Sequence, residues 1–171
     1  MRTSKRWTNA TFTHRVDHEA GKHRGPAAAK GPRVCERCGA INTKRRWTMA
    51  GAMNGLNLHA IAAPQMTVCP ACQMMAAGQF AGEVRVSGAF AASHVAEVER
   101  LIRNEARRAA DDNPLARIVR LDRVPGGLLV RTTTEHLAKR IGQALYKAMH
   151  GIVHYEFSHE NKFAHVTWSR D

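Results

Sequence analysis

The chain has few acidic residues and no long hydrophobic run. Its 171 residues carry 14 Asp and Glu against 26 Lys and Arg, which gives a formal net charge of +12 and a pI near 10.4. Such an excess of positive charge is typical of proteins that bind nucleic acid or another polyanion. No apolar stretch approaches the roughly 20 residues of a membrane span, and residues 1–6 lead into no apolar signal core. We therefore expect a cytoplasmic protein.

Recognisable catalytic motifs are also lacking. The sequence has no Gly-rich phosphate loop, no Gly-x-Ser-x-Gly elbow and no His-Glu-x-x-His helix. Its 10 histidines are scattered and form no convergent group of titratable residues. We expect a protein that is not an enzyme and that has no small-molecule substrate.

Cysteine is scarce, but all four cysteines fall in two Cys-x-x-Cys pairs, Cys35–Cys38 and Cys69–Cys72. Four thiolates can close tetrahedrally on one ion, and Zn²⁺ is the usual occupant of a four-sulfur structural site. Gly39 directly follows the first pair, where a knuckle turn needs a residue that tolerates positive φ. The sequence therefore predicts one structural Zn²⁺ held by Cys35, Cys38, Cys69 and Cys72.

Other uses of the cysteine pairs stay open. Structural disulfides would require an oxidising compartment, which no segment indicates. A thioredoxin-type redox site would require one pair at the start of a helix in a βαβ unit, and neither flank suggests that. A third alternative is a redox-responsive switch, in which oxidation of a cysteine releases the metal. The long spacing between the pairs, residues 39–68, predicts an insert that projects from the metal site.

The positive charge is concentrated toward the beginning of the chain. Residues 1–33 carry eight basic and two acidic residues, residues 34–80 carry four and one, and residues 81–171 carry 14 and 11. With only Trp7, Phe12 and Val16 as large apolar residues, residues 1–33 cannot build a core, so we predict a disordered basic tail that orders on binding. A tail that merely solubilises the protein is the alternative.

Cations interleaved with tryptophan are suited to phosphate contact and base stacking. Trp47 could equally pack the small core of the knuckles. The predicted RNA-binding residues are Lys5, Arg6, Trp7, Arg15, Lys22, Arg24, Lys30, Arg33, Arg37, Lys44, Arg45, Arg46 and Trp47.

Three parts are expected: the tail at residues 1–33, a zinc-knuckle module with an insert at 34–80, and an α+β domain at 81–171. A short strand is predicted at 83–87. Apolar residues at spacings of three and four then predict a helix at 93–110, capped by Ser93, and a hairpin follows at 117–133. A capping box at Thr132–Glu135 predicts a second helix, and alternation after Gly151 predicts a second hairpin. We expect two αββ halves: a four-stranded antiparallel sheet with two helices on one face.

The sequence also resembles a known family, through Cys-Glu-Arg-Cys-Gly at 35–39, Cys-Pro-Ala-Cys at 69–72 and Gly-Leu-Leu-Val-Arg-Thr-Thr-Thr-Glu-His-Leu-Ala-Lys-Arg-Ile-Gly at 127–142. It looks like a short bacterial relative of the large-subunit (60S) nuclear-export adaptor of eukaryotes and its archaeal counterpart. That family begins with cysteine-pair zinc modules and continues with a Gly-led strand that runs into a helix with an Ala-x-x-Leu or Ala-x-x-Ile pattern, matched by Ala138–Ile141. The chain has fewer cysteines than the family usually has and lacks its later translation-factor-like domains. It is also similar to small bacterial zinc-ribbon proteins, some of them found among low-oxygen and universal-stress genes.

The resemblance implies binding to the large ribosomal subunit, near its tRNA sites and intersubunit face. For a bacterial form it implies a role in stress, in hibernation (the inactivation and protection of ribosomes) or in subunit assembly. The expected partners are large-subunit rRNA and neighbouring ribosomal proteins. The alternative is a zinc-ribbon DNA-binding transcriptional regulator, although the sequence shows no helix-turn-helix, no Cys-Cys-His-His finger and no heptad dimeriser.

Overall fold

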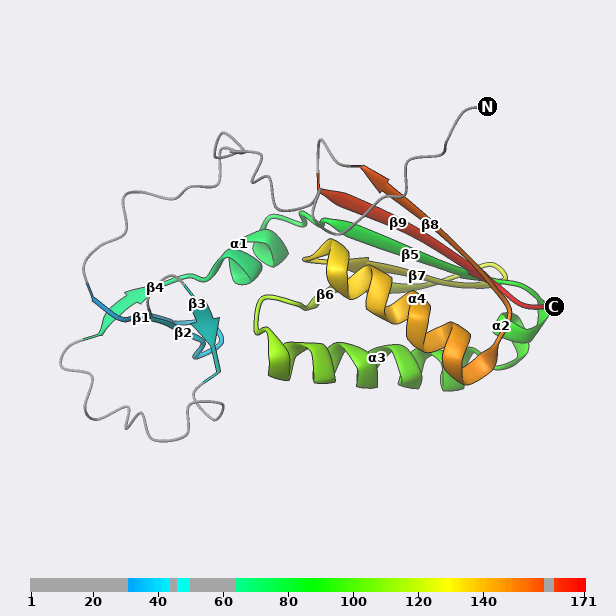
Figure 1. Ribbon diagram of the computed structural model, residues 1–171, viewed down its shortest axis with the longest axis horizontal. Helices are drawn as coiled ribbons and strands as arrows, with labels where there is room; N and C mark the ends of the chain where they lie inside the picture. Colours follow the sequence, from blue (N-terminus) through cyan, green and yellow to red (C-terminus); the bar gives the residue numbers. More distant parts are fainter. Residues whose placement is uncertain (1–30, 44–45, 50–63, 159–161) are drawn as a thin grey trace, which may run out of the picture. The chain divides into compact units, whose positions relative to one another are not determined.

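A computed structural model describes residues 31–43, 46–49, 64–158 and 162–171 (Figure 1). The chain divides into one unit at Met1–Lys30 and another at Gly31–Asp171. The predictions made for the tail up to Lys30, and those for Lys44 and Arg45, lie outside the described residues.

The described chain is a mixed α+β structure with two sheets and four helices. Its elements are β1 (Arg33–Cys35), β2 (Ile41–Thr43), β3 (Arg46–Thr48), β4 (Gln65–Thr67), α1 (Pro70–Ala76), β5 (Gly82–Ser87), α2 (Ala89–Ser93), α3 (Val95–Asp112), β6 (Ile118–Val124), β7 (Gly127–Thr132), α4 (Glu135–Met149), β8 (Ile152–Ser158) and β9 (Phe163–Ser169). We call β1–β4 with α1 the cysteine module, and β5–β9 with α2–α4 the α+β domain.

The cysteine module is built on a small four-stranded sheet in the order β3-β2-β1-β4. Strands β1, β2 and β3 follow one another as antiparallel neighbours. Strand β4 returns beside β1 and pairs with it in parallel, so that Cys35 lies opposite Thr67. This pairing brings two segments together that are about thirty residues apart in sequence, each carrying one cysteine pair.

The sheet of the α+β domain differs from the predicted one. It has five strands in the order β6-β7-β5-β9-β8, and β5 pairs in parallel with β9, so the prediction of a four-stranded antiparallel sheet was wrong. The two αββ halves, α3-β6-β7 and α4-β8-β9, are present. They are joined through β5, whose Val84 and Val86 complete the apolar surface between the two hairpins. The predicted short strand at 83–87 is thus the centre of the sheet.

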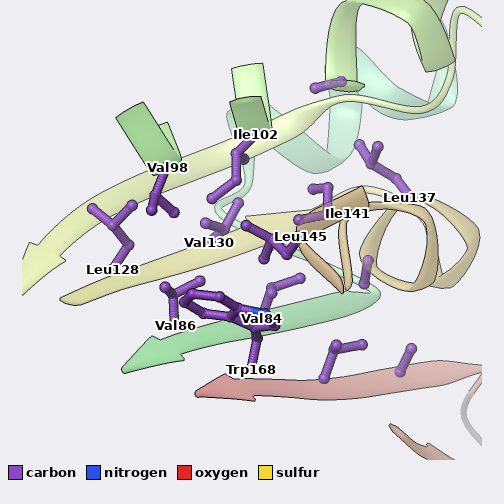
Figure 2. Packing of buried hydrophobic residues seen from close by; sticks show 14 of the residues in the cluster. Val84, Val86, Val98, Ile102, Leu128, Val130, Leu137, Ile141, Leu145 and Trp168 are labelled. Atoms are coloured by element: carbon purple, nitrogen blue, oxygen red, sulfur yellow. The ribbon is translucent and has the colours of Figure 1, made fainter. Parts of the chain in front are cut away.

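The core lies between this sheet and the long helices α3 and α4, which cover one face (Figure 1). Figure 2 shows Val84, Val86, Val130 and Trp168 of the strands pointing toward apolar side chains of the helices. The helices contribute Val98 and Ile102 from α3, and Leu137, Ile141 and Leu145 from α4. Each fully buried aliphatic side chain of this kind contributes roughly 1.5–3 kcal/mol. Two helices on one face were predicted, and this packing confirms them.

Both helix starts differ from the predicted ones. The short helix α2 precedes α3, and Ser93 ends it by donating its hydroxyl to the Ala89 carbonyl at 2.9 Å instead of capping α3. At α4 the cap is Thr134, whose Oγ1 accepts from the Leu137 N–H at 3.3 Å. Thr132 ends β7 and is fully buried, with its hydroxyl donated to the Thr134 carbonyl at 2.9 Å. The predicted capping box was therefore wrong: Thr132 is buried at the end of β7, so the helix is capped two residues later.

Candidate metal centre

The first cysteine pair lies in the tight turn between β1 and β2. Cys35 ends β1, and its N–H donates to the Ala40 carbonyl at 2.8 Å. The Gly39 N–H donates to the Cys35 carbonyl, also at 2.8 Å, with Gly39 at φ 71°. A side chain is strained at that φ, so glycine lets the turn close with Cys35 and Cys38 on the same side.

The second cysteine pair lies at the start of α1. Cys69 is the N-cap residue, Pro70 occupies the first helical turn, and the Cys72 N–H donates to the Cys69 Sγ at 3.4 Å. Proline suits this position because its fixed φ is already helical and the N–H it lacks would have no partner in the helix. One helical turn therefore sets both sulfurs facing the first pair.

The four Sγ atoms converge, and all lie within 4.8 Å of one another. Cys38 Sγ and Cys69 Sγ are 3.7 Å apart. A tetrahedron with metal–sulfur bonds of about 2.3 Å has sulfur–sulfur edges of about 3.8 Å. All four cysteines are free, and Cys35, Cys69 and Cys72 are buried. This cluster could hold one metal ion, as the sequence predicted.

Hydrogen bonds and burial act in opposite directions on these thiols. Burial raises the pKa of Cys35, but backbone hydrogen bonds, first among them the one from the Cys69 N–H at 3.3 Å, outweigh it and lower that pKa to about 6. Burial raises the pKa of Cys69 and of Cys72. A metal ion must therefore displace protons from the more buried pair, because only thiolates coordinate it.

A residue of the α+β domain also reaches the cluster. Arg117 Nη1 lies 4.0 Å from Cys72 Sγ. Its Nε donates to the Pro114 carbonyl at 2.8 Å, and its backbone N–H donates to Thr133 Oγ1, also at 2.8 Å. Leu115 of the same segment packs against the cysteines. Arg117 was not among the predicted site residues, because nothing in a linear pattern relates it to a cysteine 45 residues away.

Of the thirteen predicted RNA-binding residues, the structure describes Arg33, Arg37, Arg46 and Trp47. Arg37 and Arg46 are exposed, the first in the knuckle turn and the second on β3. Arg33 is partly buried on β1, and its Nε is buried without a hydrogen-bond partner among the described residues. Trp47 is partly buried and packs against the cysteine cluster, which was one of its two predicted roles.

Comparisons of the chain with family models, with curated proteins and with solved structures find no match. In the part of the chain that the structure describes, no helix is long and apolar enough to cross a membrane.

Proposed function

We propose that this protein is a non-catalytic ribosome-binding factor, in which one structural Zn²⁺ makes the cysteine module rigid enough to dock on large-subunit rRNA. The observation that carries the proposal is the convergence of four thiols, within 4.8 Å, in a chain with a net charge of +12. Cytoplasmic location and a role in stress, hibernation or subunit assembly belong to the same proposal.

The donor set favours zinc. Four sulfur ligands in a tetrahedral arrangement suit Zn²⁺, which imposes no geometry of its own and holds thiolates tightly. With four protein ligands the ion keeps no open position for water or substrate, which supports a structural role over a catalytic one. When bound, it would supply cross-links between the β1–β2 turn and the start of α1.

Exposed cations on a rigid module are suited to phosphate contact. Arg37 lies between the first two cysteines, and Arg46 lies on the outer strand β3 of the same small sheet. Because RNA phosphates attract such cations over a Debye length of roughly 8–10 Å, both residues would help position the module on rRNA. The basic residues at 1–33 would add sequence-independent affinity.

The proposal is tested by sedimentation of the tagged protein in lysates of growing and of starved or oxygen-limited cells. We expect it in the large-subunit or 70S fraction of a sucrose gradient at moderate salt, and we expect Cys69→Ser to leave those fractions. Met75→Ser, which changes an exposed sulfur residue of the same helix, is the matched control. Wild-type protein that stays at the top of both gradients would contradict ribosome binding, and a preference for duplex DNA over rRNA would favour the transcriptional regulator.

A further inference from the structure

A groove of about 800 Å³ runs between α3 and the edge strand β6. The arginines that line it are Arg100, Arg103 and Arg107 on α3, Arg117 just before β6, and Arg123 on β6. The carboxylates in its lining are Glu99 and Asp111. Five guanidinium groups against two carboxylates leave the groove strongly positive, although the α+β domain as a whole is the least basic part of the chain.

The arginines of α3 form a row. Arg100, Arg103 and Arg107 are three and four residues apart, so they fall on one side of the helix and extend over about 10 Å of its axis. A guanidinium group is a planar fork that matches two phosphate oxygens. A row of such forks along a groove is suited to follow a chain of phosphates.

Two of the five arginines that line the groove, one on α3 and one on β6, are held in place by one carboxylate. Glu99 Oε1 accepts from Arg103 at 2.8 and 3.0 Å, and Glu99 Oε2 accepts from Arg123 at 3.0 and 3.2 Å. The hydrogen bonds from Arg103 and Arg123 lower the pKa of Glu99, which keeps it ionised. Glu99 thus links α3 to β6, while the side chains of Arg103 and Arg123 stay 58% and 65% exposed.

The other two arginines of the α3 row are not neutralised by a carboxylate of the described structure. Arg100 and Arg107 are both exposed, and neither forms an ion pair with any residue that the structure describes. Arg107 donates only to the side-chain oxygen of Asn104, a neutral group. These two positions therefore offer full positive charges that a bound anion can neutralise.

The lining also indicates which form of nucleic acid fits. No aromatic ring is among the described residues that line the groove. Proteins that bind single strands stack bases on aromatic rings, whereas a duplex presents phosphates and keeps its bases stacked inside. The exposed, stacked pair Tyr155 and Phe157 lies on β8, the opposite edge strand of the same sheet, and cannot serve this groove.

We propose that the α3–β6 groove binds the sugar-phosphate backbone of duplex RNA through the arginine row of α3. The inference rests on the proposed rRNA binding and adds the element that carries it, a helix outside the tail and outside the cysteine module. It also assigns Arg103 and Arg123 as contacts positioned by Glu99.

The test is fluorescence anisotropy of a labelled RNA hairpin, titrated with the zinc-loaded full chain at several salt concentrations. Arg100→Ala with Arg107→Ala removes two charges without breaking an ion pair of the described structure. We expect at least about a tenfold loss of affinity and a salt slope flatter by about two units, since each lost phosphate contact removes about one.

Arg85→Ala with Arg120→Ala is the matched control. It removes an equal number of charges from exposed positions on the strands, where the register places both side chains on the face opposite the helices. Arg120 is paired with Asp122 at 2.7 Å, so this variant also breaks one exposed ion pair. We expect a change of about twofold or less, from general electrostatics alone. Circular dichroism and zinc content confirm that both variants are folded.

Equal losses in the two variants would overturn the groove while leaving ribosome binding by the full chain intact. Stronger competition by single-stranded poly(U) than by an unlabelled hairpin would overturn the assignment to a duplex. Equal competition by duplex DNA would overturn the assignment to RNA. Wild-type protein that binds neither the hairpin nor ribosomes would overturn this inference together with the proposed function.

Discussion

The cysteine module and the α+β domain are stabilised in different ways. Among the described residues, the core of the α+β domain has eighteen buried members, including Trp168, whereas the buried cluster of the cysteine module has five, three of them cysteines. The strands of the α+β domain are six or seven residues long, and those of the cysteine module are three residues long. A core that small cannot offset the entropy of ordering its chain, so the module needs a cross-link such as a metal ion.

Loss of a metal-ligating cysteine should have the largest effect on the cysteine module. Cys38→Ser should abolish zinc binding and unfold the cysteine module, because structural zinc supplies on the order of 10–16 kcal/mol in small modules. The α+β domain should stay folded. Zinc content and two-dimensional NMR check both parts, with Met75→Ser as the control. Concerted loss of both sets of signals would show that the two regions fold as one.

The next prediction concerns a substitution in the core of the α+β domain. Ile141→Ala removes a fully buried side chain of α4, and we expect it to lower the free energy of unfolding of the α+β domain by about 2–5 kcal/mol. Zinc should remain bound at low temperature. Urea unfolding measures the loss, and Ile152→Ala, the same change at a 59% exposed position, should cost about 0.5 kcal/mol or less. Equal losses would contradict the observed packing.

Acidification should weaken zinc binding by the cysteine module. Burial raises the pKa of Cys69 and of Cys72, so both thiols must release a proton when zinc binds near neutral pH. The apparent zinc affinity should therefore fall by at least about a hundredfold for each unit of pH lowered, tenfold per proton. Below about pH 6, the pKa of Cys35, the proton of that thiol adds a further tenfold to the dependence. Competition with a chromophoric chelator measures it, and an affinity that does not change with pH would contradict the buried thiols.

The smallest effect tests the polar contact of Arg117, from the α+β domain, with a cysteine sulfur. Arg117 Nη1 lies 4.0 Å from Cys72 Sγ, so Arg117→Ala should weaken zinc binding by about tenfold, as removal of outer-shell partners does. Arg117→Lys, which keeps the charge, should recover part of the loss. Arg120→Ala, which changes an exposed arginine of the adjoining strand β6, is the control. A zinc affinity equal to that of the wild type would mean that the two regions are energetically independent.

Local patterns in the sequence were sufficient for several features. The spacing of the cysteines identified the four thiols that converge, since Cys-x-x-Cys followed by glycine or containing proline encodes its own turn. The apolar positions of α3 and α4 and the hairpin strands β6–β7 and β8–β9 were likewise readable, because their periods arise within one segment.

Features that depend on distant pairing could not be read in this way. The parallel pairing of β5 with β9 joins segments about eighty residues apart, and six residues around Val84 show an alternating period but no partner. The same holds for Arg117 beside Cys72. From the sequence, the arginine row of α3 is only the solvent-exposed side of an amphipathic helix. The groove forms because β6 and the residue before it place Arg123 and Arg117 beside that side of the helix. Contacts over such separations are decided by the packing of the whole domain, which no local period encodes.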